Sequence, residues 1–299
     1  MKIRRWHIAL LVFLLIVSLT FSISQLIKSS NFERNEIAII KIEGELTNIQ
    51  SPLQFQQPST KSILENLEKA RTNNNIKAII LIINSPGGTV IASKEIAEAI
   101  EAANKPVVAV IRDIGTSGAY WVASSADLII ADELSITGSI GVTSSYLEFS
   151  GLLSKLGIQY EQLSVGEYKE LGNPFQPLKE NEKAILEKKI AIIHDSFLDS
   201  IQKKRELKNI ARIKTGEFFL GKEALELGLI DELGNLQTAI EEAKSLANLK
   251  EAKIIQYEEK KDLFNLLSQF SSEASYFIGR GIAAELKQPN LEMKYRFVS

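Results

Sequence analysis

Two segments set far apart in the chain carry side chains that together could cleave an amide bond. Ser117 lies in the sequence Gly-Thr-Ser-Gly after an apolar run, where a tight strand-to-helix turn would expose its hydroxyl group. Lys169 lies in the sequence Gly-Glu-Tyr-Lys. A serine hydroxyl is a weak nucleophile until a base removes its proton and hydrogen-bond donors stabilise the oxyanion. The two segments therefore suggest the nucleophile and the base of one active site.

A lysine can act as a base at neutral pH only in a particular environment. The free amine has a pKa of about 10.4 and is therefore protonated. Burial penalises the ammonium form and lowers this pKa, so that the neutral amine can accept a proton. Glu167 and Glu170 flank Lys169 and would oppose this shift if they faced the amine. We therefore expect both carboxylates to point away from it.

Glycine-rich turns could supply the oxyanion donors. Residues 84–88 read Asn-Ser-Pro-Gly-Gly after a strongly apolar run. Because glycine tolerates positive φ and lets another backbone approach closely, such a turn can present free N–H groups. A simple turn before the next helix would explain these residues equally well, and helix capping would explain the segment around Ser117. Each motif is therefore weak when taken alone.

Taken together, five ordered motifs resemble the signal peptide peptidase A family, membrane-anchored Ser-Lys proteases of the Clp-protease/crotonase superfamily. The motifs lie at residues 84–88, 115–119, 137–141, 166–169 and 215–234. The resemblance covers residues 36–235. It departs from the family pattern at Thr116 and Ala119, where alanine and glycine are commoner.

The resemblance implies individual roles. Ser117 would be the nucleophile, and Lys169 would be the general base and acid. Gly88 and Gly118 would donate the oxyanion-hole N–H groups, and Ser139 would hydrogen-bond and orient the amine of Lys169. Such a site needs no metal or organic cofactor. The short form of the family implies a homo-oligomer, an octamer by resemblance, in which neighbouring subunits contribute the serine and the lysine of one site.

The composition excludes other kinds of site. The chain of 299 residues has no cysteine, which rules out disulfides, thiolate catalysis and Cys-based zinc sites. Its two histidines, His7 and His194, argue against a multi-histidine metal site. A formal net charge of −2 gives no reason to expect nucleic acid as a partner.

The N-terminal segment predicts a membrane anchor. Residues 8–27 carry no charge, and a helix of about 20 residues spans a hydrocarbon core of roughly 30 Å. Because lysine and arginine are concentrated in residues 1–7, the positive-inside rule places this end in the cytoplasm. A linker over residues 28–35 would then lead to an extracytoplasmic domain at the cell membrane. Small residues late in the apolar run leave a cleaved secretory signal as the alternative.

Residues 36–299 are expected to form the peptidase domain. Apolar, β-branched runs alternate with amphipathic stretches, which argues for βαβ crossovers and a mainly parallel sheet in an α/β fold. The resemblance specifies repeated ββα units of the Clp-protease/crotonase type. We expect strands at 36–42, 77–83, 106–111, 128–131, 139–142, 158–163 and 252–257. We expect helices at 60–72, 90–103, 117–125, 179–206, 222–227, 236–247 and 262–287, the last of which would pack against another subunit.

These features favour a membrane-anchored serine endopeptidase acting on apolar, unfolded peptides, with remnant signal peptides as the expected substrates. A Ser-His-Asp hydrolase would need His194, which lies within a long predicted helix beside Ile192 and Ile193. A catalytically inactive crotonase-like membrane scaffold is another alternative. Such a scaffold would need neither Ser117 nor Lys169, yet the sequence has both. A crotonase acting on acyl-CoA would be cytosolic, which conflicts with the predicted export.

Overall fold

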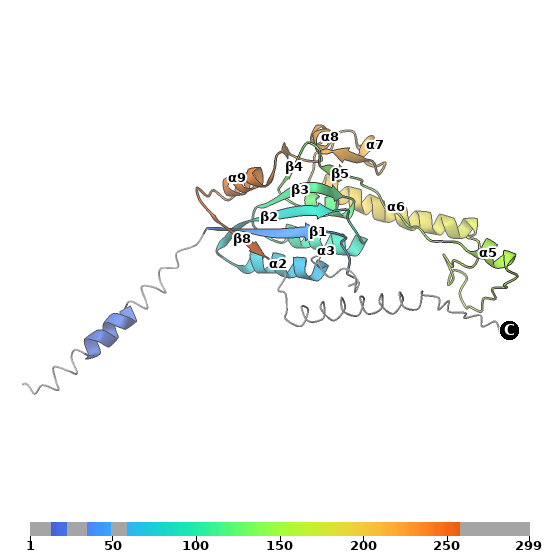
Figure 1. The fold of residues 1–299 in the computed structure, drawn as a ribbon, viewed down its shortest axis with the longest axis horizontal. Helices are drawn as coiled ribbons and strands as arrows, with labels where there is room; N and C mark the ends of the chain where they lie inside the picture. The colour runs from blue at the N-terminus through green and yellow to red at the C-terminus, as the bar shows by residue number, and fades with distance from the viewer. Residues whose placement is uncertain (1–12, 23–34, 49–58, 258–299) are drawn as a thin grey trace, which may run out of the picture.

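The computed structural model describes residues 13–22, 35–48 and 59–257. Within these residues an eight-stranded sheet forms the centre of the molecule, and helices cover both of its faces (Figure 1). The strand order is β6-β5-β3-β2-β1-β8, with β4 beside β3 and β7 beside β4. All pairings are parallel except that of β5 with β6. The predicted α/β class with a mainly parallel sheet is therefore confirmed.

Five of the eight strands lie where apolar runs predicted them, and three short strands have no predicted counterpart. The strands are β1 (Glu36–Glu43), β2 (Ile76–Ser85), β3 (Val107–Thr116), β4 (Leu128–Ala131), β5 (Ile136–Gly138), β6 (Phe218–Leu220), β7 (Glu232–Leu233) and β8 (Lys253–Tyr257). Side chains of β2 alternate between two cores, because successive residues of a strand point to opposite faces of the sheet. Ile79, Leu81 and Ile83 face one core, and Ile80 and Ile82 face the other.

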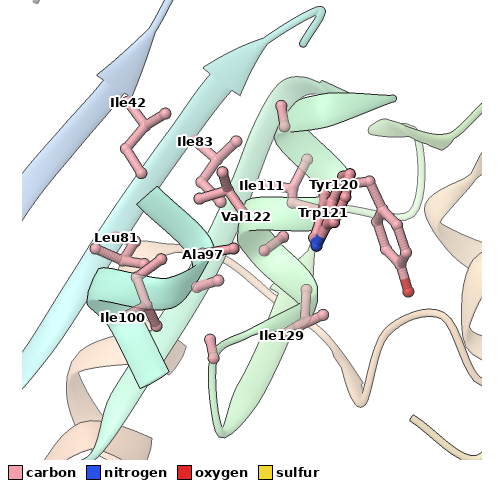
Figure 2. Close-up of a cluster of buried hydrophobic side chains, with 14 of the residues drawn as sticks. Ile42, Leu81, Ile83, Ala97, Ile100, Ile111, Tyr120, Trp121, Val122 and Ile129 are labelled. Atoms are coloured by element: carbon pink, nitrogen blue, oxygen red, sulfur yellow. The ribbon is translucent and has the colours of Figure 1, made fainter. Parts of the chain in front are cut away.

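Six of the eight helices between residues 59 and 257 lie where helices were expected, and two short ones, at 150–155 and 210–213, were not predicted. The helices are α2 (Thr60–Thr72), α3 (Val90–Glu101), α4 (Gly118–Ser124), α5 (Ser150–Lys155), α6 (Glu180–Gln202), α7 (Ile210–Ile213), α8 (Gly221–Glu226) and α9 (Leu236–Leu246). Helices α2, α3, α4 and α6 contribute to the larger core, and α9 covers the opposite face. Figure 2 shows the larger core, in which Ile83 and Ile111 of the sheet lie beside Val122 of α4. This packing fixes the start of α4 at the carboxyl end of β3.

Two predicted strands are wrong. Residues 139–142 are not a strand: β5 ends at Gly138, and Ser139 turns the chain with φ 50°. Residues 158–163 form neither strand nor helix, and the side chain of Leu163 is 100% exposed. An apolar run of this length forms a strand only where a neighbouring strand can pair with it, and this part of the chain lies away from the sheet.

The chain between β5 and α6 extends outward. Residues 150–179, the outer segment, comprise α5 and the loop leading to α6, and they lie beyond the N-terminal end of α6, away from the sheet (Figure 1). The rings of Tyr160 and Phe175 contact each other there at 5.6 Å between centroids. Apolar side chains nevertheless remain open to solvent in the single chain, and Val165 is 98% exposed.

The predicted anchor is described only in part. Residues 13–22 are helical, and they fall within the expected span of 8–27. Every helix in the described residues is too short or too polar to cross a membrane. The two ends of the expected span, most of the 28–35 linker and the whole of the predicted helix at 262–287 lie outside the described residues.

Candidate active site

Ser117 occupies a sharp turn at the carboxyl end of the sheet. It joins β3 to α4 and has φ 54° and ψ −126°, a backbone conformation that residues other than glycine rarely adopt. Its N–H group donates to the carbonyl oxygen of Gly138 at 2.8 Å, which ties the turn to the end of β5. Strained strand-to-helix turns of this kind hold the nucleophilic serine of many hydrolases.

Two glycine turns pack directly against Ser117. A Cβ atom on Gly87 would lie 2.7 Å from the amide nitrogen of Gly118, and one on Gly118 would clash with Ser93 Oγ. A Cβ atom on Gly88 would clash with the carbonyl of Leu46. Only glycine therefore allows this approach of the two backbones. Because Gly118 opens α4, its N–H group has no carbonyl partner within the helix and can serve an external acceptor.

Four of the five predicted site residues line one cavity of about 760 Å³. They are Gly88, Ser117, Gly118 and Ser139. Thr215 and Gly216, which come from a distant part of the chain, close the cavity near Ser139. The structure of the single chain thus brings a serine hydroxyl and two glycine turns together in a cleft large enough for part of a peptide.

Apolar side chains form part of the cavity lining, and this part is named the apolar wall. It consists of Val90, Trp121, Val142, Ile193 and Phe197. The ring of Trp121 stacks on that of Phe197 at 4.7 Å between centroids, with 13° between the planes. An apolar substrate side chain could bury itself against this wall without leaving polar groups unpaired.

Ser139 lies beside Ser117 because β5 pairs with the extended end of β3. Thr116 is opposite Gly138 in this pairing, so the residues that follow, Ser117 and Ser139, leave neighbouring strands. The N–H group of Ser139 donates to the carbonyl oxygen of Glu217 at 2.8 Å. The Ser139 turn is therefore held from both sides, by β3 and by the chain that leads into β6.

Lys169 is not part of this cavity in the single chain. It lies in the outer segment and is exposed. Its backbone N–H group donates to the carbonyl oxygen of Gly166 at 3.1 Å. Its acidic neighbours engage other groups. The Glu167 carboxylate, through its hydrogen bond to the Tyr168 hydroxyl, raises the pKa of Tyr168, and Glu170 accepts from Asn173 Nδ2 at 2.7 Å. The structure thus assembles the serine half of the predicted site and leaves the lysine apart.

The geometry does not support a Ser-His-Asp triad. His194 is half-buried on α6, and its Nε2 lies 3.3 Å from the carbonyl oxygen of Ile140. Asp127 and Asp132 accept hydrogen bonds from backbone N–H groups, and Asp195 is exposed. Among the described residues, no group of three or more histidine, aspartate or glutamate side chains could hold a metal ion.

Several residues that shape the cavity around the serine are not predicted from the sequence. Trp121 stands one helical turn after Ser117, which was an available signal for a side chain on the same face. Phe197 and the loop at 215–216 reach the cavity only through tertiary packing. Phe197 has no local sequence signal, and the motif at 215–234 includes Thr215 and Gly216 without indicating that they line the cavity.

Family models and curated relatives agree on the kind of protein. The model of peptidase family S49 matches residues 99–250, and the model of Clp protease matches residues 36–131. A putative protease of Methanocaldococcus jannaschii is 36% identical over 230 residues, which cover 74% of this chain and 70% of that protein. Protease 4 of Haemophilus influenzae is 33% identical over 227 residues, which cover 74% of this chain but 36% of that longer protein. A putative signal peptide peptidase SppA of Enterococcus faecium is 30% identical over 207 residues, covering 68% of this chain and 60% of that protein.

A solved structure shares the fold. It is a lysine-to-alanine variant of a membrane-bound stomatin-specific protease in complex with a substrate peptide, with a TM-score of 0.50 and 15% sequence identity. The match covers 80% of this chain and 99% of that one. The fold is common to both proteins, while the sequence matches carry the family assignment. On their extent, this chain belongs to peptidase family S49, as a serine protease of the signal peptide peptidase A family.

Proposed function

We propose that the protein is a membrane-anchored serine endopeptidase that cleaves apolar, unfolded peptides by means of a serine-lysine pair. The observation that supports this most directly is the position of Ser117 at a strained turn on the cavity, beside Gly88 and Gly118. Membership of a peptidase family implies peptide substrates. The serine-lysine chemistry, the anchoring and the assembly are parts of the proposal.

In the proposed reaction Ser117 Oγ attacks the scissile carbonyl carbon while Lys169 Nζ takes the hydroxyl proton. The N–H groups of Gly88 and Gly118 stabilise the oxyanion that forms. The tetrahedral intermediate collapses to an acyl-enzyme as the ammonium group returns its proton to the leaving amine. Lys169 then takes a proton from the water molecule that attacks the ester carbonyl, and it returns this proton to Ser117 Oγ as the C–O bond breaks and the second product leaves. Ser139 hydrogen-bonds the neutral amine and orients it.

The lysine of each site would come from a neighbouring subunit. Helix α6 has 23 residues, so it is roughly 34 Å long, and the outer segment that carries Lys169 lies beyond its far end (Figure 1). Exposed apolar side chains such as Leu163 and Val165 are consistent with burial of this segment in an assembly. We propose a homo-oligomer, an octamer by family resemblance.

The apolar wall of the cavity and the predicted anchor point to the same substrates. Trp121 and Phe197 would accept an apolar side chain, and an extended peptide could pair with exposed backbone at the site. Signal peptides left in the cell membrane after export have this chemistry. We therefore propose that residues 8–27 anchor the chain, with the N-terminus in the cytoplasm and the peptidase domain on the outer side.

Two peptides of equal length test the substrate class. One has an uninterrupted leucine-rich core, and in the other serine and asparagine replace the core residues. We expect kcat/KM to be at least about tenfold higher for the apolar peptide, because its side chains lose water against the wall formed by Trp121 and Phe197. Mass spectrometry of the products locates the cuts, and the Ser117→Ala variant controls for contaminating proteases. Equal cleavage of both peptides would refute the proposed preference.

A further inference from the structure

The Ser139 turn depends on a very short piece of sheet. Strands β5 and β6 have three residues each, and β6 is the last strand at its edge of the sheet. The chain that enters β6 accepts the hydrogen bond from Ser139 through the carbonyl oxygen of Glu217. The carbonyl of Gly138, in turn, accepts from the N–H group of Ser117. A shift of β6 would therefore move Ser139 directly and would reach Ser117 through one more hydrogen bond.

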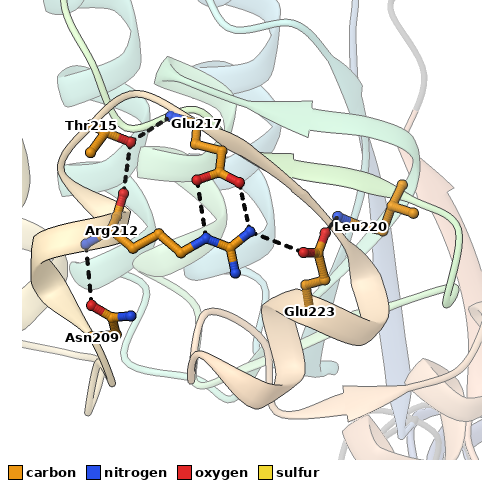
Figure 3. Close-up of polar contacts among 6 residues, drawn as sticks. All are labelled: Asn209, Arg212, Thr215, Glu217, Leu220 and Glu223. Atoms are coloured by element: carbon orange, nitrogen blue, oxygen red, sulfur yellow. Dashed lines mark hydrogen bonds and ion pairs between the residues drawn. The ribbon is translucent and has the colours of Figure 1, made fainter.

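A single guanidinium group binds carboxylates from both ends of β6. Arg212 Nε and Nη2 donate to the two oxygens of Glu217, just before the strand, at 3.0 and 2.6 Å (Figure 3). Arg212 Nη2 also donates to Glu223 Oε1 at 3.0 Å. Glu223 Oε2 accepts from the N–H group of Leu220, the last residue of the strand, at 3.2 Å. We name these three charged side chains, Arg212, Glu217 and Glu223, the arginine clamp.

The clamp is itself anchored. The guanidinium of Arg212 lies over the ring of Phe219 at 4.9 Å from its centroid, and this ring is fully buried. The backbone carbonyl of Arg212 accepts from Thr215 Oγ1 at 2.8 Å. Thr215 and Gly216 line the cavity, so the loop between the clamp and β6 is also part of the site wall.

Both acidic members of the clamp are ionised at neutral pH. Their hydrogen bonds to the Arg212 guanidinium hold the pKa of the Glu217 and Glu223 carboxyls below their usual values. A bidentate arginine-carboxylate pair fixes orientation as well as distance, which a lysine cannot do. The clamp therefore has the geometry of a positioning device.

We propose that Arg212 is a positioning residue for catalysis: through Glu217 and Glu223 it fixes β6 and thereby the backbone of Ser139. The inference rests on the proposed function, in which Ser139 orients the lysine base. Arg212 does not line the cavity and is assigned no contact with substrate.

The expected sizes of the effects on catalytic rate and on folding stability distinguish a positioning role from simple stabilisation of the fold. The side chains of the clamp are about 40% exposed, and ion pairs in such positions contribute little to global stability. In contrast, displacing an orienting group by about 1 Å can lower the rate by up to about 10²-fold. Loss of Arg212 should therefore affect turnover far more than folding.

The chain offers a matched control on α2. Arg71 Nε and Nη2 donate to the two oxygens of Glu68 at 2.6 and 2.7 Å, and these side chains are also exposed. Helix α2 ends just before β2 begins, whereas the candidate site lies at the carboxyl ends of the strands. Arg71→Met thus removes a bidentate pair of similar exposure near the amino ends of the strands, away from the candidate site.

The test compares Arg212→Met, Arg212→Lys and Arg71→Met in the full-length chain. We expect Arg212→Met to lower kcat by about 10- to 100-fold and to change KM by less than about twofold. The acid limb of the kcat/KM profile should move to higher pH by about half a unit or more, because a displaced Ser139 no longer favours the neutral amine. Arg212→Lys should lie between Arg212→Met and wild type, and Arg71→Met should match wild type.

Thermal unfolding and light scattering complete the comparison. We expect similar melting temperatures for Arg212→Met and Arg71→Met, and a wild-type oligomeric state for both. The inference fails if Arg212→Met retains the kcat and the acid limb of Arg71→Met, or if its activity falls only in proportion to the folded, assembled fraction. Full activity of Ser117→Ala would instead refute the proposed function, so the two failures are distinguishable.

Discussion

Replacing Ser117 with alanine is expected to lower kcat on an apolar peptide by on the order of 10⁵- to 10⁶-fold. The substitution removes the attacking oxygen and leaves the N–H groups of Gly88 and Gly118 in place, so substrate binding and a small residual rate should persist. Serine and alanine both carry a Cβ atom, so either residue should adopt φ 54° at a similar conformational cost. The fold should therefore be retained. Steady-state hydrolysis of the peptide, with thermal unfolding measured alongside, checks both statements.

His194→Ala is the matching control, because this is the histidine on which a Ser-His-Asp mechanism would depend. Its ring contacts the backbone carbonyl of Ile140 and does not line the cavity. We expect its kcat to stay within about threefold of wild type, the effect of losing one weak contact. Complete loss of activity in His194→Ala would overturn the assignment of Lys169 as the base.

Mixed assembly of two inactive variants is expected to restore activity. Lys169→Ala lacks the base and Ser117→Ala lacks the nucleophile, so each alone should be inactive. If neighbouring subunits share each site, random assembly of equal amounts leaves about a quarter of the sites with both residues, because the interface is head-to-tail. Co-expression with two different affinity tags, followed by tandem purification, yields the mixed oligomer for a peptide assay.

The design contains its own negative control. Ser117→Ala carrying both tags passes through the same purification and should remain inactive. If mixed oligomers are present but no more active than this control, each subunit holds a complete site. Lys169 would then have to reach its own cavity by moving the outer segment.

Much of the fold can be predicted from the sequence because buried parallel strands leave long apolar runs. The run at 77–83 has aliphatic residues on both faces, and the structure buries nearly every position of β2 between two helical layers. The prediction for β3 stopped at Ile111, since Arg112 and Asp113 are charged. These two side chains are exposed, and β3 continues to Thr116 because its end pairs with β5.

The motifs identify the serine half of the site because local turn geometry is encoded locally. Glycine is required at positions 87 and 88 by close backbone contacts and at position 118 by the Ser93 side chain, and these residues stand in short, recognisable segments. The antiparallel pairing of β5 with β6 has no such signature. It joins residues far apart in the chain through strands of three residues, so neither Glu217 nor Arg212 stands out before the structure is known. The partner of Lys169 depends on contacts between chains, which no local pattern specifies.

Acyl-enzyme trapping tests the role of Ser117 most directly. The full-length protein is mixed with an activated ester of an apolar acyl amino acid, quenched in acid, digested and examined by mass spectrometry. We predict a single acyl group on Ser117 in the wild-type protein and none in Lys169→Ala. An acyl group on a different residue, or an unmodified Ser117 in protein that turns the ester over, would contradict this prediction.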